Sequence, residues 1–148
     1  MMDCKNALQE AEGNIETAIE FLRKKGQKVA AKRSDRDAAE GVVIAKSTQD
    51  GSRGAIIVLN CETDFVAKND DFTTVANTIL ELAIEANAAD LDALKGMKYP
   101  GSELSISDKL TEEIGRIGEK LDLSAYETLS AGKVISYNHP GNKLASIV

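Results

Sequence analysis

Four carboxylates crowd into residues 62–71, and such a group could bind a hard cation, because Mg²⁺ and Ca²⁺ take oxygen ligands. They are Glu62, Asp64, Asp70 and Asp71. Their spacing does not match the calcium-loop pattern of alternating acidic residues around a glycine. Negative charge is also favoured at the start of a helix. We therefore predict that Asp70 or Asp71 is the N-cap of a helix beginning near Phe72, and that no metal is bound.

A second candidate chemistry is catalysis by Cys61, Asp64 or His139. His139 is the single histidine of the chain, and it stands in a predicted turn before Pro140. A general base needs a nucleophile and an orienting partner within reach, and the sequence identifies neither. The glycine motifs GxGxxG and GxxxxGK, which bind phosphates, do not occur. We predict that the chain is not an enzyme, uses no cofactor and binds no nucleotide directly.

The stretch NCETDFVAKNDDF, residues 60–72, places a large apolar ring among charged side chains. The run AIIVL before it, residues 55–59, predicts a buried strand. Polar residues follow this run, so we expect the strand to end before Phe65 and the ring to lie on a loop. An aromatic side chain on a loop between rigid elements is typical of a recognition anchor. Composition alone leaves packing in the core as an equal alternative.

The elements that must position this loop follow from hydrophobic periodicity and turn residues. A glycine-containing turn joins the first two strands into a hairpin, and the next helix carries the strongest apolar stripe of the chain. The order of elements predicts an α+β fold with a mainly antiparallel sheet flanked by helices. The predicted strands are 42–46, 55–59, 122–129, 133–137 and 143–148, and the predicted helices of this part are 72–86 and 107–120.

The beginning of the chain predicts two short helices, residues 3–11 and 14–25. Asn14 is a suitable N-cap, and Gly26 is a suitable residue just beyond the helix end. Two helices this short are not stable alone, so we expect a third helix or an outside surface to cover their apolar stripe. The positions of that stripe are Ile15, Ala18, Ile19 and Leu22.

We therefore expect three parts: a helical module at 1–26, a charged linker at 27–41 and an α+β core subdomain at 42–148. The module begins at Met1 without room for a further helix, and the last predicted strand runs to Val148. We expect the module to lack its first helix and the body to be part of a larger fold.

Composition and charge exclude several classes of protein. Of the 148 residues, 43% are hydrophobic and 28% are charged, which suits a globular protein. No apolar run approaches the roughly 18 residues of a membrane span, and no signal peptide opens the chain, so we expect a cytoplasmic protein. The net charge of −6 argues against nucleic-acid binding, although the basic residues of the linker could contact RNA or simply be solvated. Cys4 and Cys61 are expected to be buried, reduced thiols.

Two separate stretches, MMDCKNALQEAEGNIETAIEFLRKKGQKVAAKR and ETDFVAKNDDF, resemble the bacterial elongation factor Ts family, and VISYNHPGNKLASIV is similar to the family's hairpin. The resemblance covers essentially the whole chain. It implies a ubiquitin-associated-like helical module followed by an α+β core subdomain. It also implies the family's activity, guanine-nucleotide exchange on elongation factor Tu in protein synthesis.

The resemblance also assigns residues to partner binding. The family's intruding TDF loop and its paired methionines have counterparts here, as does one arginine of the basic pair in the linker. Core packing between helices is the alternative for both methionines. The residues so assigned are Thr63, Asp64, Phe65, Met1, Met2 and Arg33.

The expected function is to promote GDP release from elongation factor Tu by wedging the Phe65 loop near the Mg²⁺ and phosphate site of that GTPase. The main alternative is a protein-interaction module without exchange activity. An enzyme and an RNA-binding protein are further alternatives. Nucleotide release, thiol reactivity and salt-dependent RNA binding would discriminate among them.

Overall fold

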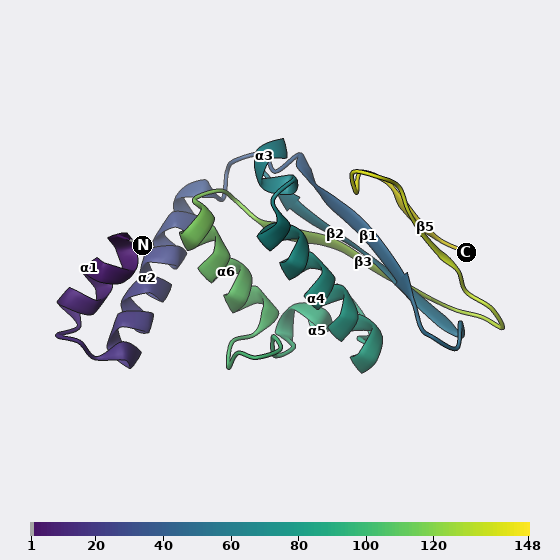
Figure 1. Cartoon of the computed structure of the whole chain (residues 1–148), viewed down its shortest axis with the longest axis horizontal. Coiled ribbons are helices and arrows are strands. Elements are labelled where there is room, and N and C mark those ends of the chain that lie inside the picture. Colours follow the sequence, from purple (N-terminus) through teal and green to yellow (C-terminus); the bar gives the residue numbers. More distant parts are fainter. Residues whose placement is uncertain (1) are drawn as a thin grey trace.

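The computed structural model describes residues 2–148, which form helices at the N-terminal end and an α+β body after them (Figure 1). This confirms the predicted fold class. The elements are α1 (Met2–Glu10), α2 (Ile15–Arg33), β1 (Glu40–Ser47), β2 (Arg53–Cys61), α3 (Asp64–Ala67), α4 (Asp70–Ala86), α5 (Leu91–Gly96), α6 (Ile106–Ile117), β3 (Asp122–Ser130), β4 (Ser136–Asn138) and β5 (Ala145–Ile147).

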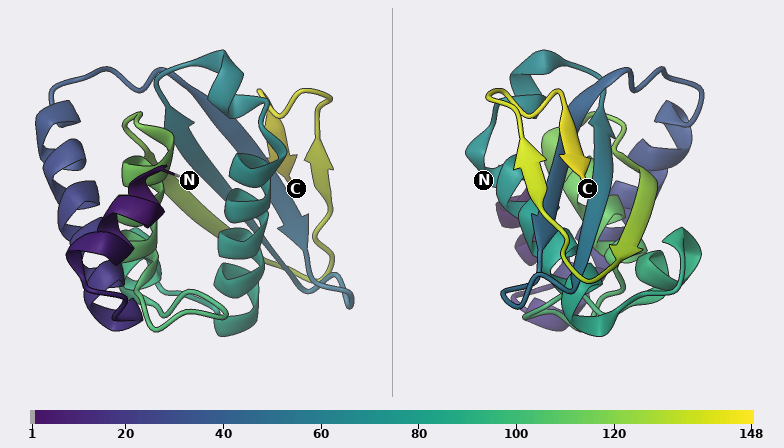
Figure 2. Two further views of the ribbon diagram at one scale, coloured as in Figure 1. Left: turned by 60° about the vertical axis from the view of Figure 1, so that its left-hand side comes forward. Right: turned by 90° about the vertical axis from the view of Figure 1, so that its right-hand side faces the viewer.

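The main sheet has three antiparallel strands in the order β1-β2-β3. Alternate residues of central strand β2 point into the core, and Ile57 and Leu59 have no exposed surface. Helix α4 covers this face with the apolar stripe that its sequence predicts, and α6 lies beside it (Figures 1 and 2). The buried residues of the α4 stripe are Phe72, Val75, Ala76, Ile79, Leu80 and Ala83.

The β4–β5 hairpin lies along β1, on the side away from α4 and α6 (Figure 2). Edge strand β1 would otherwise leave backbone groups unpaired, which is a liability for any sheet. Asn138 donates to the Ala45 carbonyl and accepts from the Ala45 N–H, at 2.8 and 2.7 Å. The Val43 N–H donates to the carbonyl of Asn142 at 2.8 Å. The hairpin therefore closes the β1 edge.

Helix α2 is longer than expected. Asn14 is its N-cap, as predicted, and accepts from the Thr17 N–H at 3.1 Å. The predicted end at Gly26 is wrong, because the helix continues to Arg33 and Gly26 is buried inside it. Val29 and Ala30, in the predicted linker, pack against the core of the body. That packing stabilises a stretch that has no helical periodicity of its own.

Other boundaries also differ from the sequence-based expectation. Helix α4 begins with Asn69 as N-cap, so neither Asp70 nor Asp71 caps it; both lie in its first turn. Helix α5 was not predicted, and Cys4 is exposed where a buried thiol was expected. Between residues 2 and 148, no helix combines the length and apolar character needed to cross a membrane.

Candidate protein-binding site

The candidate site lies directly after β2, where the chain turns into the single helical turn α3. Thr63 is the N-cap of α3, with an extended backbone (φ −124°, ψ 153°), and its hydroxyl accepts from the Val66 N–H at 3.4 Å. The sequence predicted an irregular loop here. A helical turn forms instead, because the cap satisfies an N–H group that would otherwise lack a partner.

The ring of Phe65 points out of this turn, with 82% of the residue exposed. On the same turn, Ala67 is buried and Val66 packs against the core. Phe72, only seven residues later, is 2% exposed and lies in the centre of the core. The core alternative for Phe65 is therefore wrong, and the turn presents a large apolar ring to the outside.

Asp64 forms an ion pair with Lys68 one helical turn later, at 2.6 Å. The hydrogen bond from Lys68, followed by its positive charge, lowers the pKa of the Asp64 carboxyl. Both side chains are largely exposed, so the pair contributes little to stability. A partner could displace Lys68 from Asp64 without a large free-energy cost.

Arg33 lies at the end of α2 and binds Glu62, which immediately precedes the turn. Its Nη1 donates to both carboxylate oxygens of Glu62, at 2.8 and 2.9 Å. The Lys120 backbone N–H donates to Glu62 at 2.7 Å. These contacts lower the pKa of Glu62, with the Lys120 N–H as the largest cause and Arg33 as the next. The predicted contact residue Arg33 is thus engaged within the chain, beside the Phe65 turn.

Glu119 is a neighbour of the turn that sequence reasoning missed. Its Oε1 accepts from the Thr63 hydroxyl at 2.7 Å, and its Oε2 accepts from the Thr63 N–H at 3.1 Å. The two residues are 56 positions apart, and Glu119 lies in the short connection after α6. Nothing in the local pattern could have revealed this contact.

The paired methionines lie elsewhere. Met1 falls outside the described residues. Met2 begins α1 and is 68% exposed, so it does not pack between helices. Ile15 and Ile19 of the predicted α2 stripe are 68% and 58% exposed, and only Ala18 and Leu22 pack inward, against Ala7 and Ala11. The apolar stripe of α2 is therefore only partly covered in the described chain.

The candidate catalytic residues Cys61, Asp64 and His139 each contact a different residue, namely Thr63, Lys68 and Tyr137. Burial raises the pKa of the Cys61 thiol to about 11, because a thiolate is poorly solvated there. His139 is exposed, and its Nδ1 shares a hydrogen bond with the Tyr137 hydroxyl at 2.8 Å.

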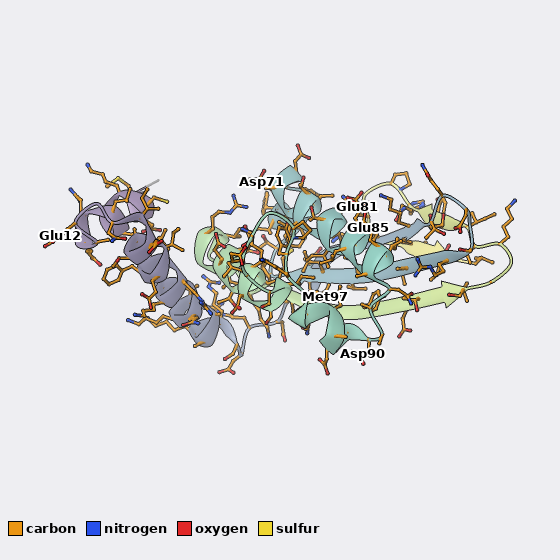
Figure 3. The ribbon with its side chains drawn as sticks, turned by 90° about the horizontal axis from the view of Figure 1, so that it is seen from below. Glu12, Asp71, Glu81, Glu85, Asp90 and Met97 are labelled. Carbon is orange, nitrogen blue, oxygen red and sulfur yellow. The ribbon has the colours of Figure 1, made fainter. Side chains whose placement is uncertain are left out.

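The acidic residues of the same region are held apart in separate contacts. Asp71, labelled in Figure 3, lies in the first turn of α4. It pairs with Arg116 of α6 at 3.1 Å. Asp64 pairs with Lys68, and Glu62 pairs with Arg33. Across the part of the chain that the structure describes, no group of three or more His, Cys, Asp and Glu residues could hold a metal.

Comparison with known proteins identifies the family of the chain. The family described as Elongation factor TS matches residues 62–148. The chain is 57% identical over 145 residues to elongation factor Ts of Christiangramia forsetii, covering 98% of this chain and 52% of that protein. It is 53% identical over 148 residues to elongation factor Ts of Amoebophilus asiaticus, covering 100% and 53%.

These matches place the chain among translation elongation factors. It belongs to the elongation factor Ts family. The chain spans about half the length of the curated relatives it matches.

Proposed function

We propose that this chain promotes guanine-nucleotide exchange on elongation factor Tu, and that the Thr63-Asp64-Phe65 turn is the part that acts on the GTPase. The observation that carries the proposal is the 82% exposure of Phe65 on a turn fixed by its neighbours. An exposed aromatic on a rigid support has the character of an interface anchor. Membership in the elongation factor Ts family supports elongation factor Tu as the partner, and a role in protein synthesis supports a cytoplasmic location.

The mechanism is displacement by a wedge. A GTPase holds GDP through backbone groups around the phosphates and through Mg²⁺, whose octahedral coordination tolerates little distortion. Insertion of the Phe65 ring near that site displaces the groups that hold the metal and the phosphates. Asp64, freed from Lys68, can accept hydrogen bonds from partner N–H groups and set the depth of insertion. Met2, exposed on α1, provides a second apolar contact.

No covalent chemistry is required in this mechanism, so the chain acts as a binding protein with a kinetic effect. Binding of the chain and binding of GDP oppose each other by the same factor, as thermodynamic linkage requires. GDP should therefore weaken the complex as strongly as the chain weakens GDP binding. Arg33 can add a contact to the partner only if it leaves Glu62, or through those of its donors that do not bind Glu62.

The test is release of labelled GDP from elongation factor Tu, with the 148-residue chain added. Phe65→Ala should slow the stimulated release about tenfold or more, because anchors of this kind contribute about 2 kcal/mol or more. Asp64→Ala should have a smaller effect. Tyr137→Ala is the matched control, since it removes another exposed aromatic, from β4, and should leave the rate unchanged.

Two outcomes would count against the proposal. An unchanged rate of stimulated GDP release with Phe65→Ala would contradict the wedge mechanism. Binding of the wild-type chain to the GTPase without faster GDP release would favour the alternative, a protein-interaction module without exchange activity.

A further inference from the structure

We infer that Glu119 is a positioning residue for Phe65: its carboxylate holds Thr63 so that the α3 turn presents the ring in one fixed direction. The inference rests on the proposed function, because it explains how the chain holds the Phe65 ring in position for insertion before the partner binds. It concerns a residue that the sequence did not single out and that lies outside the Thr63-Asp64-Phe65 turn.

The geometry fixes both the backbone and the side chain of Thr63. One oxygen of Glu119 binds the Thr63 N–H, and the other binds its hydroxyl hydrogen. A hydroxyl that donates toward Glu119 keeps a lone pair for the Val66 N–H, which it accepts at 3.4 Å. The carboxylate therefore orients the cap, and the cap orients the first turn on which Phe65 stands.

Besides the Thr63 cap, the contacts that hold the turn lie mainly in its second half, where Val66 packs against the core. Helix α3 has four residues, far fewer than an isolated helix needs in water. The Asp64–Lys68 pair is largely exposed and weak. Ala67 is buried and anchors the end of the turn, whereas Phe65 is too exposed to hold itself in place. The start of the turn thus depends on the Thr63 cap.

The hydrogen bonds between residues 62–63 and residues 119–120 run in both directions, and this restricts movement of the turn. Glu119 accepts from the backbone of Thr63, while Glu62 accepts from the backbone of Lys120 at 2.7 Å. Two adjacent residues of one segment are thus bonded to two adjacent residues of the other. Arg33 joins the same group through Glu62. Hydrogen bonds to charged acceptors are the stronger kind, and several together restrict rotation as well as distance.

A turn that is already ordered in the free chain binds its partner more tightly, because binding does not have to order it. If the turn were free to move, binding would have to order it, and that cost would lower the rate enhancement about two- to tenfold. Glu119→Ala should therefore weaken exchange without removing any side chain of the turn.

The first measurement is amide hydrogen exchange in the free 148-residue chain. With Glu119→Ala, exchange at Thr63 should become about tenfold faster or more, the effect expected when a charged acceptor is lost. Glu119→Gln keeps one acceptor oxygen and should give an intermediate rate. The control Glu103→Ala removes the same charge from a side chain that is 92% exposed, and should leave the Thr63 amide unchanged.

The hydroxyl can be tested separately from the carboxylate. Thr63→Val removes the hydroxyl with almost no change of shape and should speed exchange at the Val66 amide. Thr63→Ser restores the hydroxyl and should return that amide toward the wild-type rate. Faster exchange in the valine variant with rescue by serine supports the oriented cap; equal rates in both variants would overturn it.

The second measurement is a double-mutant cycle in the GDP-release assay. If Glu119 acts through Phe65, Glu119→Ala slows stimulated release about two- to tenfold in the wild-type background and has no further effect in Phe65→Ala. A merely structural role would lower the rate by the same factor in both backgrounds, and that result would overturn the inference. No change at Thr63 in hydrogen exchange would overturn it as well.

The two proposals fail in different ways. If Phe65→Ala alone leaves GDP release unchanged, the proposed function fails, whatever hydrogen exchange shows. If Phe65→Ala slows release but Glu119→Ala leaves it unchanged, the function stands and the positioning role is wrong.

Discussion

Gly26 of α2 and Gly115 of α6 lie in direct backbone contact, since a Cβ placed on Gly115 would be 2.7 Å from the Cα of Gly26. A Cβ on Gly26 would be 2.8 Å from the Thr111 carbonyl oxygen. Two glycines thus let the N-terminal helices approach the body closely. This contact sets the position of α2, and with it the place where Arg33 meets Glu62.

Gly115→Ala should destabilise the chain, even though alanine favours a helix by about 1 kcal/mol over glycine. The new methyl group would meet backbone that cannot rotate away, and overpacking of this kind costs about 1–3 kcal/mol. Chemical denaturation would measure the free energy of unfolding. Gly96→Ala is the control, because a Cβ there has open space around it, and this variant should be neutral or more stable. Equal stability of the two variants would show that the helices do not pack this closely.

Phe65→Ala and Phe72→Ala should separate function from stability. Phe72 is 2% exposed in the core, so its truncation should cost about 3–5 kcal/mol of unfolding free energy. Phe65 is 82% exposed, so its truncation should change stability by no more than about 0.5 kcal/mol. Thermal unfolding of both variants checks this. A large loss of stability in Phe65→Ala would mean that the ring packs within the chain.

The carboxylate of Glu62 should make stability depend on pH. Its pKa is lowered in the folded state by the Lys120 N–H and then by Arg33. A lowered pKa means that the carboxylate stabilises the fold fully above its unfolded pKa, about 4.3, and less as the pH falls through the folded value. The difference in unfolding free energy between wild type and Glu62→Gln should be constant near neutral pH and shrink below about pH 4.

Urea denaturation at a series of pH values would measure that difference. Glu103→Gln provides the control for charge, because that side chain is 92% exposed. A difference that grows on acidification would have the wrong sign for a carboxylate stabilised by hydrogen-bond donors.

The two thiols should react at very different rates. Cys4 is exposed on α1, whereas Cys61 has no exposed surface, and burial raises its pKa to about 11. Because the thiolate is the reactive form, an alkylating reagent at pH 8 should label Cys4 and leave Cys61 unmodified in the folded chain. Mass spectrometry of native and urea-unfolded samples would follow the labelling. Rapid native labelling of Cys61 would indicate that β2 opens at its end.

The sequence by itself determined the elements whose signals are local. The stripe of α4 is buried as its 3.6-residue period predicts, and the alternation of β2 places Ile57 and Leu59 inside. Asn14 caps α2 as predicted, because an N-cap acts within three residues of itself. The motif around Phe65 was also visible, since an aromatic after a finished strand stands out against charged neighbours.

Only the tertiary structure decided the features that join distant segments. Gly26 is suited to a helix end by its local pattern, but its contact with Gly115 and the packing of partly buried Val29 against the core extend the helix past it. Thr63 and Glu119 are 56 positions apart, and their contact depends on where α6 ends against the sheet. The physical reason is the distance along the sequence over which each kind of interaction acts. Caps and periodicity act between residues close in sequence, whereas packing and side-chain networks form only after the chain has brought remote residues together.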